Sequence, residues 1–216
     1  MSWLDAVPAE ELERLQPRFL TRSYRRGESL VQQGDPSANV FVIDAGHAAV
    51  RVATDHSEFL TVTVIGPGAT FGEIAGLSGT ETRTATVVAL DAVRARVLPH
   101  RVFEDVRRRV PAVDRAIAEA LAARVDDLSR RLAETTYETV QRRCGRRLLE
   151  LADLMAEPGG RAASIPVTQE DLAGLVGATR PTVNQVIGRL SDARLIRLGR
   201  GRIDVPDREA LRRFVG

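Results

Sequence analysis

The hydrophobic pattern of this 216-residue chain changes its period part of the way along, and the change separates two kinds of structure. From about residue 18 to residue 98, short apolar runs alternate with glycine-containing turns such as Gly34-Asp35 and Ala45-Gly46. Several runs alternate apolar with polar residues, which is typical of half-buried strands. The expected strands are 29–31, 39–43, 49–52, 60–64, 86–89 and 93–97. Many short strands at close spacing predict a small antiparallel β-barrel or jelly roll.

A long helix is expected after the strands. Residues 111–136 contain no internal glycine or proline, and Pro111 suits the first turn of a helix. An apolar residue recurs every three or four positions, between charged flanks, at Ile117, Leu121, Val125, Leu128 and Leu132. A seam this narrow is typical of a coiled coil. We therefore expect helix 111–135 to pair with the same helix of a second copy of the chain. A helix packed on its own domain is the alternative.

Helical and strand patterns continue on both sides of these segments. Residues 1–16 predict a short amphipathic helix, and another helix is expected to end near Met155. Two short helical patterns follow at 168–176 and 179–190, and a strand-like pair follows them. That pair comprises residues 196–198 and 202–205, with a turn at Gly199-Arg200-Gly201.

Composition and charge narrow the function classes. A single cysteine, Cys144, excludes an intrachain disulfide and a four-cysteine metal site. No apolar stretch is long enough to span a membrane and the start of the chain does not resemble a signal peptide, so a cytoplasmic location is expected. Residues 135–216 hold 14 arginines against 10 acidic residues, whereas residues 1–134 hold 17 against 19. The basic last part suggests that it binds nucleic acid.

Residues 71–84 form a candidate anion-binding segment. Gly72 and its small neighbours let backbone N–H groups approach a ligand. Arg83 follows eleven residues later and offers paired donors to a phosphate. Glu73 would accept hydrogen bonds from hydroxyls such as those of a ribose, and Thr84 adds a hydroxyl donor.

Residues 168–190 form a candidate helix-turn-helix. Thr168 is expected to cap the first helix, Gly177 to supply the turn, and Thr179 to cap a second helix that has Pro181 in its first turn. The polar residues away from the apolar stripe of the second helix are Arg180, Thr182, Asn184, Gln185 and Arg189. Such side chains suit base edges in the major groove. A structural helical hairpin with a solvated face is the alternative.

Both motifs resemble those of a known family. The run F-G-E-I-A, followed by R-T-A eleven residues on, is similar to the phosphate-binding cassette of cyclic-nucleotide-binding domains. The order of cassette, long helix and helix-turn-helix resembles the Crp/Fnr family of bacterial transcription regulators over essentially the whole chain. The resemblance implies an α+β fold: a sensor barrel or jelly roll (1–110), a dimerisation helix and hinge (111–137), and a winged helix-turn-helix (138–216).

The resemblance also implies an effector site. Gly72 and Glu73 would contact a ribose, and Arg83 and Thr84 a cyclic phosphate. The expected effector-binding set is completed by Ile74, Ala75, Leu128 and Ser129. The last two stand where cyclic-AMP-responsive members contact adenine, but a leucine cannot hydrogen-bond a purine edge. Cyclic AMP is the first expectation, cyclic GMP the second, and a degenerate pocket with another effector or none is the alternative.

For DNA the resemblance implies a homodimer on a palindromic site, with RNA polymerase as a further partner. Arg180 would read a guanine, whereas Thr168, Gln169 and Thr179 would approach phosphates. Arg200 at the wing tip would lie near the DNA backbone. The expected DNA-binding set is completed by Thr182, Asn184, Gln185 and Arg189.

We expect no enzymatic activity and neither a metal nor a cofactor. The residues show no metal-ligand triad, nucleophile–base arrangement or paired catalytic carboxylates. A haem sensor would need an axial ligand. His47, His56 and His100 are the candidates, and solvated histidines are the expectation for all three.

Overall fold

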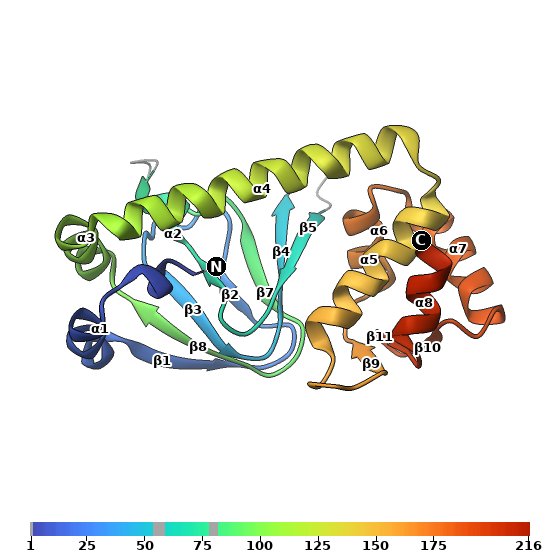
Figure 1. Ribbon diagram of the computed structural model, residues 1–216, viewed down its shortest axis with the longest axis horizontal. Helices are drawn as coiled ribbons and strands as arrows, with labels where there is room; N and C mark the ends of the chain where they lie inside the picture. Colours follow the sequence, from blue (N-terminus) through green and yellow to red (C-terminus); the bar gives the residue numbers. More distant parts are fainter. Residues whose placement is uncertain (1, 54–58, 78–81) are drawn as a thin grey trace. The chain divides into compact units, whose positions relative to one another are not determined.

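The computed structural model describes residues 2–53, 59–77 and 82–216 (Figure 1). The chain divides into two compact units, Met1–Ala53 with Ile65–Ser129, and Thr54–Val64 with Arg130–Gly216. The division falls within a long helix, which the sequence analysis assigned to a segment of its own.

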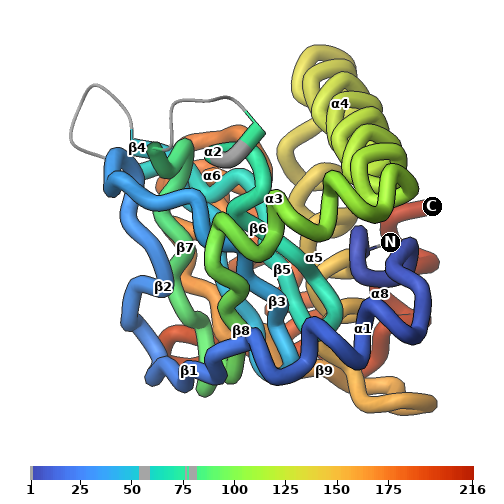
Figure 2. The backbone as a smooth tube through the Cα atoms, turned by 90° about the vertical axis from the view of Figure 1, so that its left-hand side faces the viewer, coloured from blue at the N-terminus to red at the C-terminus, as the bar shows by residue number. Residues whose placement is uncertain are grey.

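Two antiparallel sheets of four strands each form the first part of the fold. The first has the order β1-β8-β3-β6, with β1 Leu20–Tyr24, β8 Val93–Leu98, β3 Val40–Ala45 and β6 Thr70–Phe71. The second has the order β2-β7-β4-β5, with β2 Ser29–Val31, β7 Thr86–Ala89, β4 Ala48–Ala53 and β5 Phe59–Ile65. Figure 2 shows β3 and β8, which pair antiparallel, lying side by side. The jelly-roll prediction is confirmed, whereas a closed barrel is wrong because the strands belong to two separate sheets.

Alternation along the strands explains how the sheets bury one face. In β8, Val93, Ala95 and Val97 are buried, whereas Arg94 between them is exposed. Successive side chains of a strand point to opposite faces, so this pattern commits one face to the core. The inward side chains of β3, β4, β7 and β8 form one apolar cluster.

Helices form a second apolar cluster in the same unit. The cluster is formed by η1 Trp3–Ala6, α1 Ala9–Leu15, α3 His100–Arg109 and the first part of α4 Pro111–Tyr137, with Val40 and Leu98 from the strands. Two further helices, η2 Gln16–Arg18 and α2 Glu73–Leu77, contribute no buried residue to it. The single helix predicted over residues 1–16 is interrupted before Pro8, which is the N-cap residue of α1. The Trp3 and Phe103 rings pack edge to face with their centroids 5.0 Å apart.

The apolar seam of α4 has two environments. Ile117 is 3% exposed and packs in the helical cluster of its own unit, with Leu121 partly buried beside it. Val125, Leu128 and Leu132 are 61%, 46% and 70% exposed. The first half of the seam therefore stabilises the monomer, and the second half is available to another surface.

The second unit contains a helical domain with a small sheet. Its further elements are α5 Val140–Met155, β9 Ala163–Ile165, α6 Gln169–Val176, α7 Arg180–Asp192, β10 Arg197–Gly199, β11 Arg202–Val205 and α8 Arg208–Val215. The sheet order is β10-β11-β9. The predicted helix pair and strand pair are confirmed.

Local capping interactions define the helix-turn-helix. The Thr168 hydroxyl accepts a hydrogen bond from the Asp171 backbone N–H, and the Asp171 carboxylate accepts one from the Thr168 N–H. This reciprocal capping box satisfies two amide donors at the start of α6. Gly177 ends α6 in the left-handed conformation, with φ 66° and ψ 49°. Thr179 occupies the N-cap position of α7, but its hydroxyl makes no capping bond and lies 2.9 Å from the Thr182 hydroxyl.

The end of α4 is bound tightly to α5 within the second unit. Arg143, 5% exposed, donates hydrogen bonds to the carbonyls of Glu138 and Thr135 near the end of α4. It also donates to the carbonyls of Val176 and Gly177 at the end of α6. One guanidinium thus satisfies carbonyl groups that two helix ends leave without intrahelical partners.

Candidate functional site

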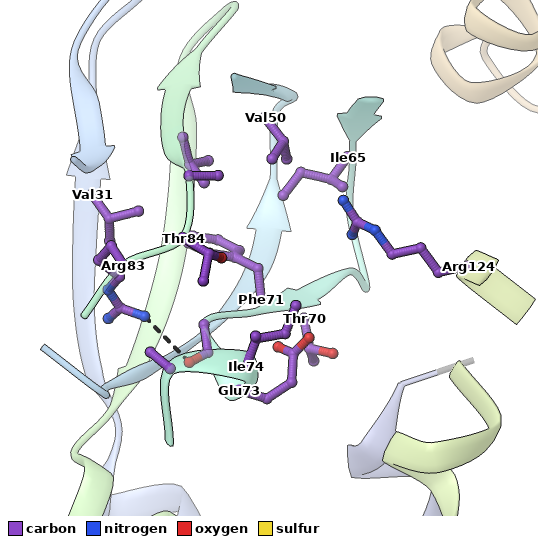
Figure 3. A pocket seen from close by; sticks show the side chains of 14 residues that line it. Val31, Val50, Ile65, Thr70, Phe71, Glu73, Ile74, Arg83, Thr84 and Arg124 are labelled. Atoms are coloured by element: carbon purple, nitrogen blue, oxygen red, sulfur yellow. Dashed lines mark hydrogen bonds between the residues drawn. The ribbon is translucent and has the colours of Figure 1, made fainter. Parts of the chain in front are cut away.

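A cavity in the first unit is bordered by both sheets, α2 and α4 (Figure 3). Val31, Val50, Ile65 and Val87 give it an apolar wall. Its polar groups come from Thr70 of β6, from the segment between β6 and β7, and from α4. Such a cavity, apolar with a few convergent polar groups, is typical of a small-molecule site.

The polar end of the cavity is shaped by Gly72, which lies between β6 and α2. Its φ of +97° is a conformation that glycine adopts without strain. A Cβ atom there would lie 2.5 Å from Nη1 of Arg83 and 2.6 Å from the Asn39 carbonyl oxygen. Glycine is therefore required both by the backbone turn and by the close approach of the arginine.

Arg83 is 5% exposed and is held mainly by backbone groups. Nη1 donates to the Gly72 carbonyl at 3.3 Å, and Nη2 donates to the Asn39 carbonyl at 2.7 Å and to the Ser37 hydroxyl at 3.2 Å. Its Nε is buried without a hydrogen-bond partner. Burial lowers the pKa of Arg83, although Glu73 and Asp35 act in the opposite direction.

Glu73 provides an acidic group in the same cavity as Arg83. Its Oε2 is buried and accepts no hydrogen bond. Burial raises the pKa of the Glu73 carboxyl, opposed by its own backbone N–H and by the charges of Arg124 and Arg83. The cavity thus holds a buried cation and a buried carboxylate, each with an unsatisfied polar atom.

Arg124, on α4, lines the same cavity and was missed by the sequence analysis. Figure 3 shows its side chain extending from α4 toward Ile65. Its position four residues before Leu128 places both on one face of the helix, which is the sequence signal that points to it.

The structure brings together most of the predicted effector residues. Gly72, Glu73, Ile74, Ala75, Arg83 and Thr84 all line the cavity. Leu128 and Ser129, both exposed on α4, are not among the described residues that line it. The contacts of all eight with an effector stay predictions.

The second candidate site is the exposed face of the helix-turn-helix. Val183, Val186, Ile187 and Leu190 bury one side of α7. Seven of the predicted DNA-binding residues are exposed, and Gln169 and Thr182 are half-buried. The exposed seven are Thr168, Thr179, Arg180, Asn184, Gln185, Arg189 and Arg200.

Charge on this face is only weakly compensated. Arg180 has its Nη1 3.9 Å from the Glu170 carboxylate, and both side chains are largely exposed. Such surface pairs contribute little to stability, so Arg180 remains available to a ligand. In the wing formed by β10 and β11, Arg202 pairs with Asp204, and Arg200 stands at the turn between the strands.

The histidines and the cysteine are the residues that could bind a metal or react as nucleophiles. The His47 ring contacts the Asp91 carboxylate at 2.8 Å, and His56 lies outside the described residues. Within the described ranges, no group of three histidine, cysteine or acidic side chains is placed to hold a metal ion. Burial raises the pKa of the Cys144 thiol to about 12, which makes it unreactive. No described helix has the length and apolarity needed to cross a membrane.

The fold combines a jelly roll, a long helix and a winged helix-turn-helix, and the jelly roll contains a cavity with a buried arginine. This combination is typical of DNA-binding regulators that have a ligand-sensing domain. Family models support both halves: residues 21–109 match the cyclic nucleotide-binding domain, and residues 142–214 match the Crp-like helix-turn-helix domain. The chain belongs to the Crp/Fnr family of transcription regulators. These matches describe regulators, in agreement with the expectation that the chain is not an enzyme.

Individual relatives cover most of the chain. It is 29% identical over 198 residues to the cyclic AMP receptor protein of Thermus thermophilus, covering 91% of this chain and 88% of that protein. It is 28% identical over 193 residues to a CRP-like cAMP-activated global transcriptional regulator of Mycobacterium tuberculosis, covering 88% and 85%.

Solved structures share the fold. FixK2 from Bradyrhizobium japonicum superposes with a TM-score of 0.75 at 18% identity, covering 92% of this chain and 98% of that one. The c-di-GMP-responsive regulator CLP of Xanthomonas campestris superposes with a TM-score of 0.74 at 20% identity, covering 92% and 99%.

Proposed function

We propose that the chain is a cytoplasmic, homodimeric transcription regulator whose binding to a palindromic DNA site is controlled by a cyclic nucleotide in the cavity. The observation that carries the proposal is the pair of unsatisfied charged groups in the cavity walls, Arg83 and Glu73. A buried charge without a full set of partners costs stability, so a ligand that completes both sets is favoured.

The chemistry of the two groups fits one ligand class. A guanidinium matches a phosphate through paired N–H donors, and a carboxylate accepts hydrogen bonds from ribose hydroxyls. The Thr84 hydroxyl lines the same cavity and adds a donor or acceptor. The apolar wall opposite suits the face of a base. Together these features favour a nucleotide with a single compact phosphate over a free sugar or an inorganic anion.

We also propose which base the cyclic nucleotide carries. Relatives are named for cyclic AMP, and cyclic AMP remains the first candidate for this chain. Leu128 offers adenine no hydrogen bond, so we expect weaker base discrimination than a polar residue there would give. Cyclic GMP is therefore the comparison ligand.

The exposed half of the α4 seam supports a homodimer. Val125, Leu128 and Leu132 are spaced three and four residues apart, as in the core positions of a coiled coil. Their exposed fractions are too large for residues that serve only the monomer. The α4 helix of a second copy would fit against these residues because it presents the same apolar seam. Two copies of α7 would then meet two half-sites of DNA, and RNA polymerase is the proposed partner on that DNA.

The proposal is tested by measuring DNA binding by fluorescence anisotropy, with and without each cyclic nucleotide. The duplex is one selected by the wild-type protein from a random pool. We expect a cyclic nucleotide to strengthen binding and Arg83→Ala to lose that response, whereas Arg94→Ala, an exposed arginine of β8, keeps it. A normal response in Arg83→Ala would overturn the assignment of the cavity.

The second candidate is a regulator whose pocket is degenerate, so that it binds DNA constitutively or answers another effector. It is favoured by the positions of Leu128 and Ser129, because neither is among the described residues that line the cavity. Tight DNA binding unchanged by either cyclic nucleotide would support it.

A further inference from the structure

The outward face of α7 has a centre and two edges. The buried stripe of Val183, Val186, Ile187 and Leu190 fixes which side of the helix faces the core. Pro181, Gln185 and Gly188, spaced four and three residues apart, lie on the opposite side. A Cβ atom at Gly188 would meet nothing within 4 Å. The protein's own packing therefore makes no use of the centre of this face.

The edges of the face carry charge and amide groups. Arg180 and Asn184 flank the centre on one side, and Arg189 flanks it on the other. Arg189 beside an uncharged centre is complementary to a phosphate backbone that borders a groove, and Arg180 on the other side is suited to the guanine expected for it. This arrangement fits double-stranded DNA, with the centre facing the bases.

The side chains at the centre restrict which bases they recognise. Residues near the start of a recognition helix contact base edges in the major groove. Pro181 has no side-chain donor or acceptor, and the one apolar group that a base pair presents there is the thymine methyl. Gln185 has an amide that pairs with N6 and N7 of adenine. The lack of a side chain at Gly188 lets the helix lie close to the base edges.

We propose that α7 reads a thymine methyl with Pro181 and an adenine with Gln185 in each half-site. The inference rests on the proposed function, because it takes DNA as the ligand of this face. It adds the base identities that the half-site must contain.

The adenine contact is tested by selecting duplexes from a random pool with the full-length protein, with cyclic AMP, cyclic GMP or neither. We expect one adenine position to lose its preference in Gln185→Ala, with affinity for the wild-type site falling about tenfold or more. Gln16→Ala is the matched control: it removes an exposed amide outside α7 and leaves the preference at that position unchanged. Thermal unfolding verifies that both variants are folded.

The thymine contact is tested with uracil, which lacks only the methyl group. Replacing the predicted thymine by uracil should weaken wild-type binding several-fold and leave binding by Pro181→Ser unchanged. Serine is compatible with the first turn of a helix, so this variant keeps α7.

The possible outcomes separate the two proposals. A selected palindrome whose base preferences are the same in Gln185→Ala, or equal binding of thymine and uracil duplexes by the wild type, overturns this inference and leaves the proposed function standing. Failure to select any sequence under all three conditions overturns both.

Discussion

At the residue scale, the cavity depends on groups that are unfavourable in the free protein. Arg83 is buried and Glu73 is half-buried, each has a buried polar atom without a hydrogen-bond partner, and Gly72 adopts a conformation that admits the arginine. Such a site lowers the stability of the free protein but strengthens the binding of a ligand.

The sequence predicted these residues because their spacing is a motif. It did not predict Arg124, because α4 carries several arginines and only the four-residue spacing from Leu128 distinguishes this one.

Glu73→Gln tests this trade directly. Burial raises the pKa of the Glu73 carboxyl, so its ionised form is less favourable in the folded protein than in the unfolded one. Above the folded-state pKa, the ionised carboxylate therefore lowers stability, and the neutral amide should raise the unfolding temperature by a few degrees. The difference should shrink as the pH falls through the folded-state pKa, because the wild-type carboxyl then becomes neutral. Thermal melts from pH 4 to pH 8 measure this difference in unfolding temperature. Calorimetry should also show that Glu73→Gln binds the nucleotide about tenfold more weakly than the wild type. A wild type more stable than the variant at pH 8 would contradict the account.

Two helical glycines give opposite predictions for the same substitution. Gly188→Ala adds a methyl group in open space and improves helix propensity, so unfolding should become more costly by up to about 1 kcal/mol. At Gly174 in α6, a Cβ atom would lie 2.6 Å from the backbone nitrogen of Thr61, so Gly174→Ala should destabilise by about 1–3 kcal/mol. Denaturant unfolding of both variants measures the two changes. Equal effects would show that α6 does not pack against Thr61.

At the element scale, sequence patterns predicted most of the strands and the long helix, but they missed α3 and α8, which bury apolar faces, as well as shorter or exposed elements. Strand β7 was predicted with its exact bounds because its burial is strong, whereas four of the five residues of β1 are exposed. Strand β6 has two residues and α2 has five, which is too short for any period to show. The long α4 was predicted almost to the residue, but the pattern did not show that its seam divides between core and surface.

The junction of α4 and α5 was expected to be a hinge, and hydrogen bonds restrain it within the second unit. The carbonyls bonded to Arg143 belong to the ends of two helices, and Glu134, 5% exposed, contacts both Arg146 and Arg147. A buried carboxylate between two arginines has the compensation that an isolated buried charge lacks. The last turns of α4 therefore belong structurally with α5.

Replacing Arg143 tests this restraint. Arg143→Met keeps the apolar stem but leaves several buried carbonyls without donors, so we expect a loss of about 3 kcal/mol or more in the free energy of unfolding. The neighbouring Arg142 is exposed, and Arg142→Met should change stability by less than about 0.5 kcal/mol. Urea unfolding followed by circular dichroism compares the pair. Similar losses in both variants would show that the carbonyl contacts of Arg143 are unimportant.

At the scale of the whole molecule, the proposed regulator contains two copies of the chain. Leu132, 70% exposed on α4, belongs to the seam proposed to pair with the partner helix. Leu132→Glu should weaken the dimer at least tenfold, because two carboxylates would face each other across an apolar stripe. Leu154→Glu on α5, at a leucine 41% exposed, is the control and should leave the dimer intact. Analytical ultracentrifugation gives both results, and an unchanged dimer in Leu132→Glu would contradict the proposed interface.

Calorimetric titration of the purified protein tests whether the cavity binds a cyclic nucleotide through Arg83. Cyclic AMP and cyclic GMP are titrated in parallel into the wild type, Arg83→Ala and Arg94→Ala. We expect binding of at least one nucleotide by the wild type and by Arg94→Ala, with affinity about 10–100-fold lower in Arg83→Ala. Binding of neither nucleotide, or equal binding by Arg83→Ala and the wild type, would contradict this expectation.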